Sequence, residues 1–238
     1  MAPHVEYRNR LQKECSRLHK TRQMSETLAL GILLAAVGGF LDAYTYLCRG
    51  RVFANAQTGN IVLLGMNLAQ GRLHESEKYL IPILAFAGGI VVAELVRTFC
   101  KRIRLLHWRQ IVIAFEIILL LGVTFIPQSE GLNMLTNIMV SFVCALQVQS
   151  FRKLNGNLFA TTMCTGNLRS ATEHLYYAVR HRDRRELQHG LEYFGVIVFF
   201  ILGAMRGAVT AVHLGIRSML IAILGLAVVF CMMFIEKW

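Results

Sequence analysis

The sequence has few charged residues and few prolines. Charged side chains make up 16% of the 238 residues, whereas a soluble globular domain carries roughly 25%. Only three prolines are present, which disfavours a loop-rich fold. Hydrophobic residues make up 55% of the chain, and the mean hydropathy is +0.49. The composition excludes an ordinary soluble domain and predicts an all-α, polytopic protein whose main partner is the lipid bilayer.

Acidic residues are scarcer than basic ones. The chain has 14 Asp and Glu against 25 Lys and Arg, for a formal net charge of +11. In a soluble protein this excess would suggest a nucleic-acid partner. Here the basic residues cluster in short segments between apolar runs, where positive charge sets membrane topology. We therefore expect no nucleic-acid partner.

Several chemical signatures are missing. The six cysteines contain no C-x-x-C pair, which argues against a disulfide framework or a zinc site. The eight histidines contain no H-x-x-x-H or H-E-x-x-H constellation, and no G-x-S-x-G, phosphate-binding loop or dinucleotide fingerprint occurs. We expect no metal, no cofactor and no catalytic residues, and hence not an enzyme.

Six apolar segments are present, approximately 28–47, 80–97, 110–126, 132–151, 194–212 and 218–235. Most approach the roughly 20 residues that cross a hydrocarbon core. Residues 1–27 are polar and basic, so we predict a cytoplasmic N-terminal segment followed by an uncleaved first span. The rest divides into a first membrane repeat, 28–126, and a second, 132–238, within one integral membrane domain.

A short polar motif occurs once in each repeat. Residues 53–60 read Phe-Ala-Asn-Ala-Gln-Thr-Gly-Asn, and residues 159–167 read Phe-Ala-Thr-Thr-Met-Cys-Thr-Gly-Asn. The two Thr-Gly-Asn triplets are Thr58-Gly59-Asn60 and Thr165-Gly166-Asn167, which lie 107 residues apart. Two copies in matching contexts indicate an internal duplication.

The segments after the two triplets are too short or too polar for ordinary spans. Residues 61–69 are apolar but only about half a span long, which suits a re-entrant or interfacial helix. Residues 168–179 place apolar residues at three- and four-residue steps among charged ones, which predicts an amphipathic helix.

The charge of the loops decides between two topologies. If both Thr-Gly-Asn helices crossed the membrane, there would be eight spans in parallel halves, and the basic loop 98–109 would lie outside. That placement violates the positive-inside rule. If the helices turn back, six spans place 98–109 inside with the N-terminus. Three spans per half then make the second half inverted relative to the first, a 3+3 arrangement that many transporters share.

The triplets are the predicted site. Thr58 and Thr165 are expected to be N-caps, Gly59 and Gly166 to allow close approach, and Asn60 and Asn167 to supply donors and acceptors. Two half-helix N-termini would then face a small polar solute or an anion. An alternative, which we weigh about equally, is that the motifs only lock two re-entrant turns together.

Three further polar residues are assigned to this site. Asp42 lies in the first apolar segment, Gln149 occupies the matching position 107 residues later, and Arg206 lies at a similar outer depth. Intramembrane ionisable residues are functional candidates with a named partner. We predict an Asp42–Arg206 ion pair, with a structural role favoured slightly over a proton relay. Glu94 is expected to pair with Arg97, and Gln147 and Gln149 to face different sides.

Small residues mark expected helix contacts. Gly38-Gly39, Gly88-Gly89 and the G-x-x-x-G match from Gly203 to Gly207 predict close helix packing, either within the bundle or in a homo-oligomer.

The segments 38–47 (Gly-Gly-Phe-Leu-Asp-Ala-Tyr-Thr-Tyr-Leu), 53–60, 145–147 (Ala-Leu-Gln) and 161–167 together resemble the YoaK-type family, bacterial membrane proteins of unknown function. The resemblance covers nearly the whole chain from about residue 30. Family members tend to read Leu-Gln-Asn where this chain reads Leu-Gln-Val at 146–148. The resemblance implies a multi-pass protein of the bacterial inner membrane and no established activity.

Three functions are compared on these observations. A channel or secondary transporter for a small polar solute or anion is favoured. A non-catalytic membrane scaffold or partner subunit is the main alternative. A lipid-modifying membrane enzyme is the weakest, because carboxylates and histidines do not cluster in the sequence.

Overall fold

The computed structural model describes residues 27–100, 108–154, 157–158 and 163–234. The elements are α2 (Leu28–Cys48), α3 (Gln57–Ala69), α4 (Leu73–Cys100), α5 (Trp108–Thr124), α6 (Glu130–Ser150), β1 (Lys153–Leu154), β2 (Asn157–Leu158), α7 (Cys164–His181), α8 (Arg184–Leu214), the 3-10 turn η2 (Gly215–Ser218) and α9 (Met219–Met232). The strands form one short antiparallel hairpin. The predicted all-α class is confirmed. Residues 1–26 of the predicted cytoplasmic segment lie outside the described residues.

Each predicted apolar segment coincides with one helix. By length and composition, four stretches of the described chain are long and apolar enough to cross a membrane: Leu28–Cys48, Leu73–Phe99, Glu130–Ser150 and Arg184–Met232. The last stretch contains both α8 and α9, whereas α5 has only 17 residues. The chain is therefore a helical protein with membrane-type helices, and the count of six spans stays a prediction.

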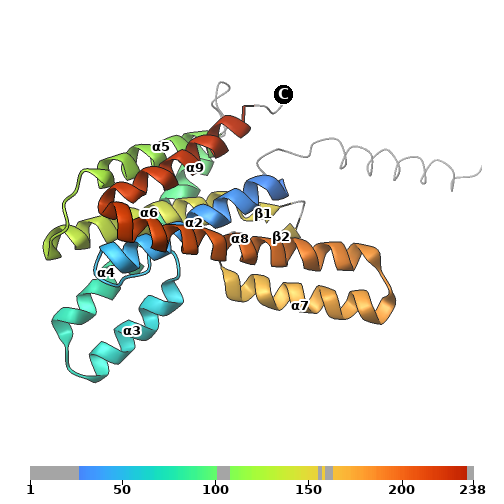
Figure 1. Ribbon diagram of the computed structural model, residues 1–238, viewed down its shortest axis with the longest axis horizontal. Coiled ribbons are helices and arrows are strands. Elements are labelled where there is room, and N and C mark those ends of the chain that lie inside the picture. Colours follow the sequence, from blue (N-terminus) through green and yellow to red (C-terminus); the bar gives the residue numbers. More distant parts are fainter. Residues whose placement is uncertain (1–26, 101–107, 155–156, 159–162, 235–238) are drawn as a thin grey trace, which may run out of the picture.

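The two halves of the chain pack through matching helix pairs. Helix α2 packs against α8, as α6 packs against α4. Helix α3 lies on α4, as α7 lies on α8, and α5 contacts α6, as α9 contacts α2. Figure 1 shows the α3–α4 hairpin toward one end of the long axis and the α7–α8 hairpin toward the other. Exchanging α2–α5 with α6–α9 thus preserves the main packing pairs.

Glycines allow the closest of these contacts. A Cβ on Gly203 of α8 would lie 1.9 Å from the carbonyl oxygen of Ala36 in α2, and one on Gly39 would lie 2.1 Å from that of Phe200. Gly89 makes the same kind of contact between α4 and α6. The predicted role of these glycines in helix packing is confirmed, because their backbones touch where any side chain would clash.

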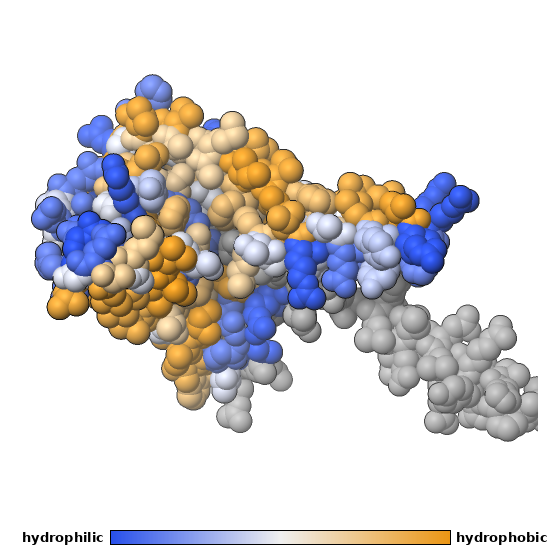
Figure 2. All heavy atoms as spheres, turned by 90° about the horizontal axis from the view of Figure 1, so that it is seen from below, coloured by the Kyte–Doolittle hydropathy of each residue, from blue (hydrophilic) through white to orange (hydrophobic). Residues whose placement is uncertain are grey.

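Apolar side chains cover much of the outer surface. Figure 2 shows several orange patches among blue and pale areas on the visible face, while apolar and polar residues separate to opposite sides of the projecting α7–α8 end. Large exposed apolar residues on α4 and α8 include Leu84, Val91 and Val209. The main core cluster instead joins α2, α5, α6 and α9. Helices α4 and α8 therefore present the surface that lipid would cover.

The α2–α8 contact can be tested with two glycines of the same helix. Gly203→Ala would force a Cβ into the backbone of α2, so we expect a clear fall in Tm in detergent. Gly195→Ala is the control, because a Cβ there meets no heavy atom within 4 Å, and alanine favours a helix interior by about 0.5–1 kcal/mol. Equal Tm values for the two variants would contradict the close packing.

Candidate functional site

The chain between α2 and α3 turns back into the bundle. Residues 52–56 form neither helix nor strand, and Val52, Ala54 and Asn55 are buried. Buried backbone N–H groups need hydrogen-bond partners. Within an apolar surrounding, irregular backbone is tolerated only where protein or trapped water supplies these partners.

Two side chains of α2 supply those partners. Asp42, which is 5% exposed, accepts at Oδ1 from the N–H groups of Asn55 at 2.7 Å and Ala56 at 3.2 Å. Thr45 Oγ1 accepts from the N–H group of Ala54 at 3.2 Å. Asp42 lies six residues before the end of α2, about 9 Å along the helix axis. The loop is thereby held inside the bundle rather than beyond its end.

The first Thr-Gly-Asn triplet holds the same loop from the other side. The fully buried Asn60 amide pairs with the backbone of Phe53: Oδ1 accepts from its N–H group at 3.0 Å, and Nδ2 donates to its carbonyl at 2.6 Å. Nδ2 also donates to Gln57 Oε1 at 3.0 Å. A Cβ on Gly59 would lie 2.9 Å from the Phe53 ring. We call Asp42, Thr45 and Asn60 the loop clamp.

The predicted N-cap roles of the threonines are wrong. The N-cap positions of α3 and α7 are held by Ala56 and Met163, neither of which caps its helix with a side chain. Thr58 and Thr165 are each the second residue of their helix, and both are exposed. The reason is that each helix begins one residue before its threonine, so Thr58 and Thr165 lie inside the first turn rather than at the N-cap position, from which a side chain can accept from the amides of that turn.

The second triplet has the same place in its helix. Asn167 is the fourth residue of α7, as Asn60 is of α3, and it is 2% exposed. Gly166 is exposed, and a Cβ there would meet no described heavy atom within 4 Å. Thr165 borders a shallow groove along α7 with Leu168 and Tyr176. Residues 159–162 of this motif lie outside the described residues.

Helix α7 packs in one buried cluster with the helix that carries Asp42. Ala171 of α7 and Ala35 of α2 lie together with Tyr193 and Val196 of α8 in this cluster. Burial raises the pKa of the Cys164 thiol at the start of α7, and the Asp42 carboxylate raises that pKa further. The first half of α7 therefore belongs to the same part of the bundle as α2, although the triplets are 107 residues apart in sequence.

The remaining predicted site residues have other surroundings. Gln149, the counterpart of Asp42, donates to Glu94, whose carboxylate also contacts Arg97 Nη1 at 3.3 Å. The Glu94–Arg97 prediction is confirmed. Gln147 donates to the carbonyl of Leu34 at 3.0 Å, so the two glutamines face different helices, as predicted.

The predicted Asp42–Arg206 ion pair is wrong. Arg206 is exposed on α8, and no ion pair joins these two residues. The loop clamp explains why this ion pair does not form, because Oδ1 of Asp42 is turned toward the amides of Asn55 and Ala56.

A buried arginine was missed by the sequence analysis. Arg49 is 0% exposed, and its guanidinium donates to Tyr44 Oη at 2.9 and 3.1 Å and to the carbonyls of Ile126 at 2.8 Å and Pro127 at 3.1 Å. No described carboxylate pairs with it. The available signal was a tyrosine five residues before an arginine at the end of an apolar segment.

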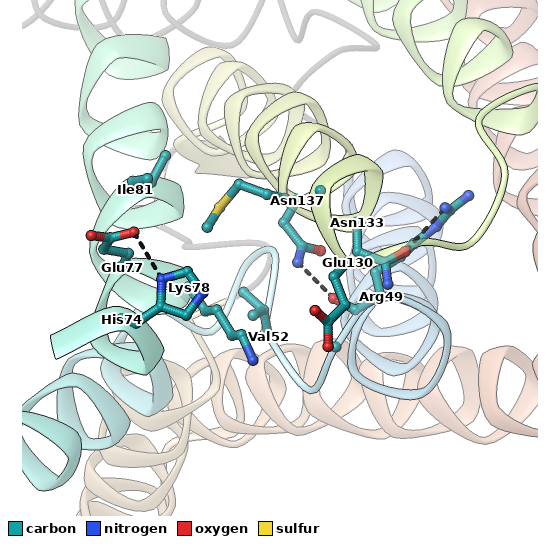
Figure 3. Close-up of a pocket in the computed structure, with 12 residues that line it drawn as sticks. Arg49, Val52, His74, Glu77, Lys78, Ile81, Glu130, Asn133 and Asn137 are labelled. Atoms are coloured by element: carbon teal, nitrogen blue, oxygen red, sulfur yellow. Dashed lines mark hydrogen bonds and ion pairs between the residues drawn. The ribbon is translucent and has the colours of Figure 1, made fainter. Parts of the chain in front are cut away.

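Arg49 borders a cavity of about 620 Å³ at the end of the bundle where α2 ends and α6 begins. Figure 3 shows Lys78 of α4 and Glu130 of α6 on facing sides of this cavity. Asn137 donates to the carbonyl of Arg49 at 2.7 Å, and its buried Oδ1 has no partner among the described residues. A cavity of this size with polar groups of both charges accommodates a small polar molecule.

The loop clamp can be tested with two asparagines of α3. Asn60→Ala leaves the partly buried N–H and carbonyl groups of Phe53 without their side-chain partner, and each such group left unpaired costs up to about 1–3 kcal/mol. Asn67→Ala removes the hydrogen bond that Asn67 Nδ2 donates to the carbonyl of Leu63, one turn earlier in α3. We expect the first substitution to lower Tm in detergent much more than the second, and equal effects would contradict the clamp.

Comparison with known proteins places the chain in a family. A family model described as "Protein of unknown function (DUF1275)" matches residues 30–232. No curated protein and no solved structure matches the chain. The YoaK-type name continues to rest on the motifs alone.

Proposed function

The chain belongs to the DUF1275 family of proteins of unknown function, and from the geometry above we propose that it is a membrane transport protein, a channel or secondary transporter, for a small polar solute or an anion. The observation that carries this proposal is the buried start of α3. Helix α3 begins at a loop that Asp42 and Asn60 hold inside a bundle of membrane-type helices, and its counterpart α7 shares a buried cluster with α2, the helix that carries Asp42.

The proposed topology has six spans and two inverted halves. Its support is that the packing pairs are preserved when the halves are exchanged, and that the α3–α4 and α7–α8 hairpins lie toward opposite ends of the long axis. Loop charge favours a cytoplasmic N-terminus, and the resemblance of the motifs supports the bacterial inner membrane as the location. The Arg49 cavity would then open on the outer side, where a solute first meets the protein.

The proposed solute path passes between the two helix starts. Helix N-termini carry partial positive charge and favour anions or polar neutral molecules. Asp42 and Asn60 are engaged in the loop clamp, so they support the path. Thr58, Thr165 and Gly166 are exposed, so they are available to line it. Neither Gln149 nor Arg206 is needed for this arrangement.

One observation favours the alternative of a membrane scaffold or partner subunit. The amide of Asn60 is used entirely by Phe53 and Gln57, so the first triplet already has a structural role. The exposed apolar faces of α4 and α8 would then serve contacts with a second copy or another membrane protein.

Flux into liposomes separates the two functions. We expect the purified protein to speed the passage of at least one solute from a panel of urea, glycerol, chloride, nitrate and formate, relative to empty liposomes. Thr58→Val plus Thr165→Val should lower that flux without lowering Tm, because both threonines are exposed. Unchanged flux in this double variant would rule out the proposed path, and no flux of any solute would favour the scaffold.

A further inference from the structure

The core contains a buried carboxyl group without a hydrogen-bond partner among the described residues. Glu116 lies at the middle of α5 and is 0% exposed. Neither Oε1 nor Oε2 has a hydrogen-bond partner among the described residues. A charged carboxylate without partners is strongly disfavoured in an apolar interior, and such groups in membrane helices commonly carry protons or ions.

The surroundings of Glu116 favour a proton over a metal cation. The buried residues one turn before and after it on α5, Val112 and Leu120, are apolar, as is Ile113. On α9, which packs against α5, the buried residues include Ile223 and Leu226. A hard metal cation needs several oxygen ligands, and no group of metal-binding side chains occurs in the described part of the chain.

Among the described residues, the titratable groups on α5 and on the helices that pack against it offer Glu116 no compensating cation. On α6, Cys144 is buried. On α4, Glu94 is paired with Arg97. On α5 itself, Arg109 donates to the carbonyl of Ser150. Helix α9, Met219–Met232, has no acidic or basic residue, and its Cys231 is exposed.

Glu116 lies on a helix that shares the main core cluster with the helix that carries Asp42. That cluster contains Ile113 and Leu120 of α5 together with Leu41 and Tyr44 of α2. Asp42 holds the loop before the first triplet. A rearrangement of α5 that opens Glu116 to water would therefore act on the packing of the helix that carries the loop clamp.

We propose that Glu116 is a proton-binding site that couples proton movement to transport, an inference that rests on the transport function proposed above. One Oε atom of Glu116 holds the proton while the carboxyl is enclosed. Release requires a second arrangement in which water reaches the carboxyl, because the enclosed carboxylate has no partner to stabilise its charge. The alternation between these arrangements is what a proton-coupled transporter needs.

Dicyclohexylcarbodiimide reports this proton directly, because it modifies protonated carboxyl groups in apolar surroundings. The full chain in liposomes is treated over a range of pH, and mass spectrometry locates the adduct. We expect labelling of Glu116, falling about tenfold per pH unit above a midpoint. Glu116→Gln should abolish this adduct, whereas Glu94→Gln, which alters a partly exposed and paired carboxylate, should retain it.

The outcomes separate the proton site from the transport function. No adduct at Glu116, or an adduct that is constant across the pH range, overturns the proton site even if the wild-type protein transports solute. A pH-dependent adduct together with loss of pH-gradient-driven flux in Glu116→Gln supports the coupling. A pH-dependent adduct in a protein without any flux retains the proton site and refutes the transport function with its coupling. These labelling results come from the wild-type chain, so they hold even if Glu116→Gln does not fold.

Discussion

The need to satisfy buried backbone amides shapes the centre of this protein. After α2 the chain returns into the bundle without forming a helix or strand, and Val52, Ala54 and Asn55 are buried there. Asp42 and Thr45 accept from these groups, and Asn60 pairs with Phe53. Because the loop is held at this depth, α3 begins inside the bundle. The proposed path depends on this arrangement.

The two halves have matching helix contacts but different polar interactions. In both halves, a glycine brings a long helix into close contact with the backbone of its neighbour. Gly203 of α8 lies against α2, and Gly89 of α4 lies against α6. The polar positions differ, because Asp42 binds its own loop whereas its counterpart Gln149 reaches across to Glu94. The helix contacts therefore match between the two halves, whereas the chemistry at these polar positions does not.

The sequence predicts the helices well because their signal is local. Apolar run length marks the six helix cores, and glycine pairs mark the contacts at Gly39, Gly89 and Gly203. The partner of Asp42 could not be predicted. An arginine at a similar depth, Arg206, does not determine the direction of the carboxylate, which accepts from the backbone of Asn55 instead. The threonine caps were wrong because each helix begins one residue before its threonine, a boundary that the Thr-Gly-Asn triplet does not mark. Arg49 was missed because its acceptors are carbonyls from another loop, more than 75 residues away.

The central claim is that α3 turns back rather than crossing the membrane, so that the halves are inverted. The most direct test is the labelling of single cysteines by a membrane-impermeant thiol reagent in intact cells, after the six native cysteines have been replaced. One cysteine is placed in residues 71–79 and the other, in a separate variant, in residues 98–109. The inverted arrangement predicts labelling of 71–79 from outside and protection of 98–109. Labelling of 98–109 with protection of 71–79 would show that α3 spans and that the halves are parallel, which would contradict the proposed site.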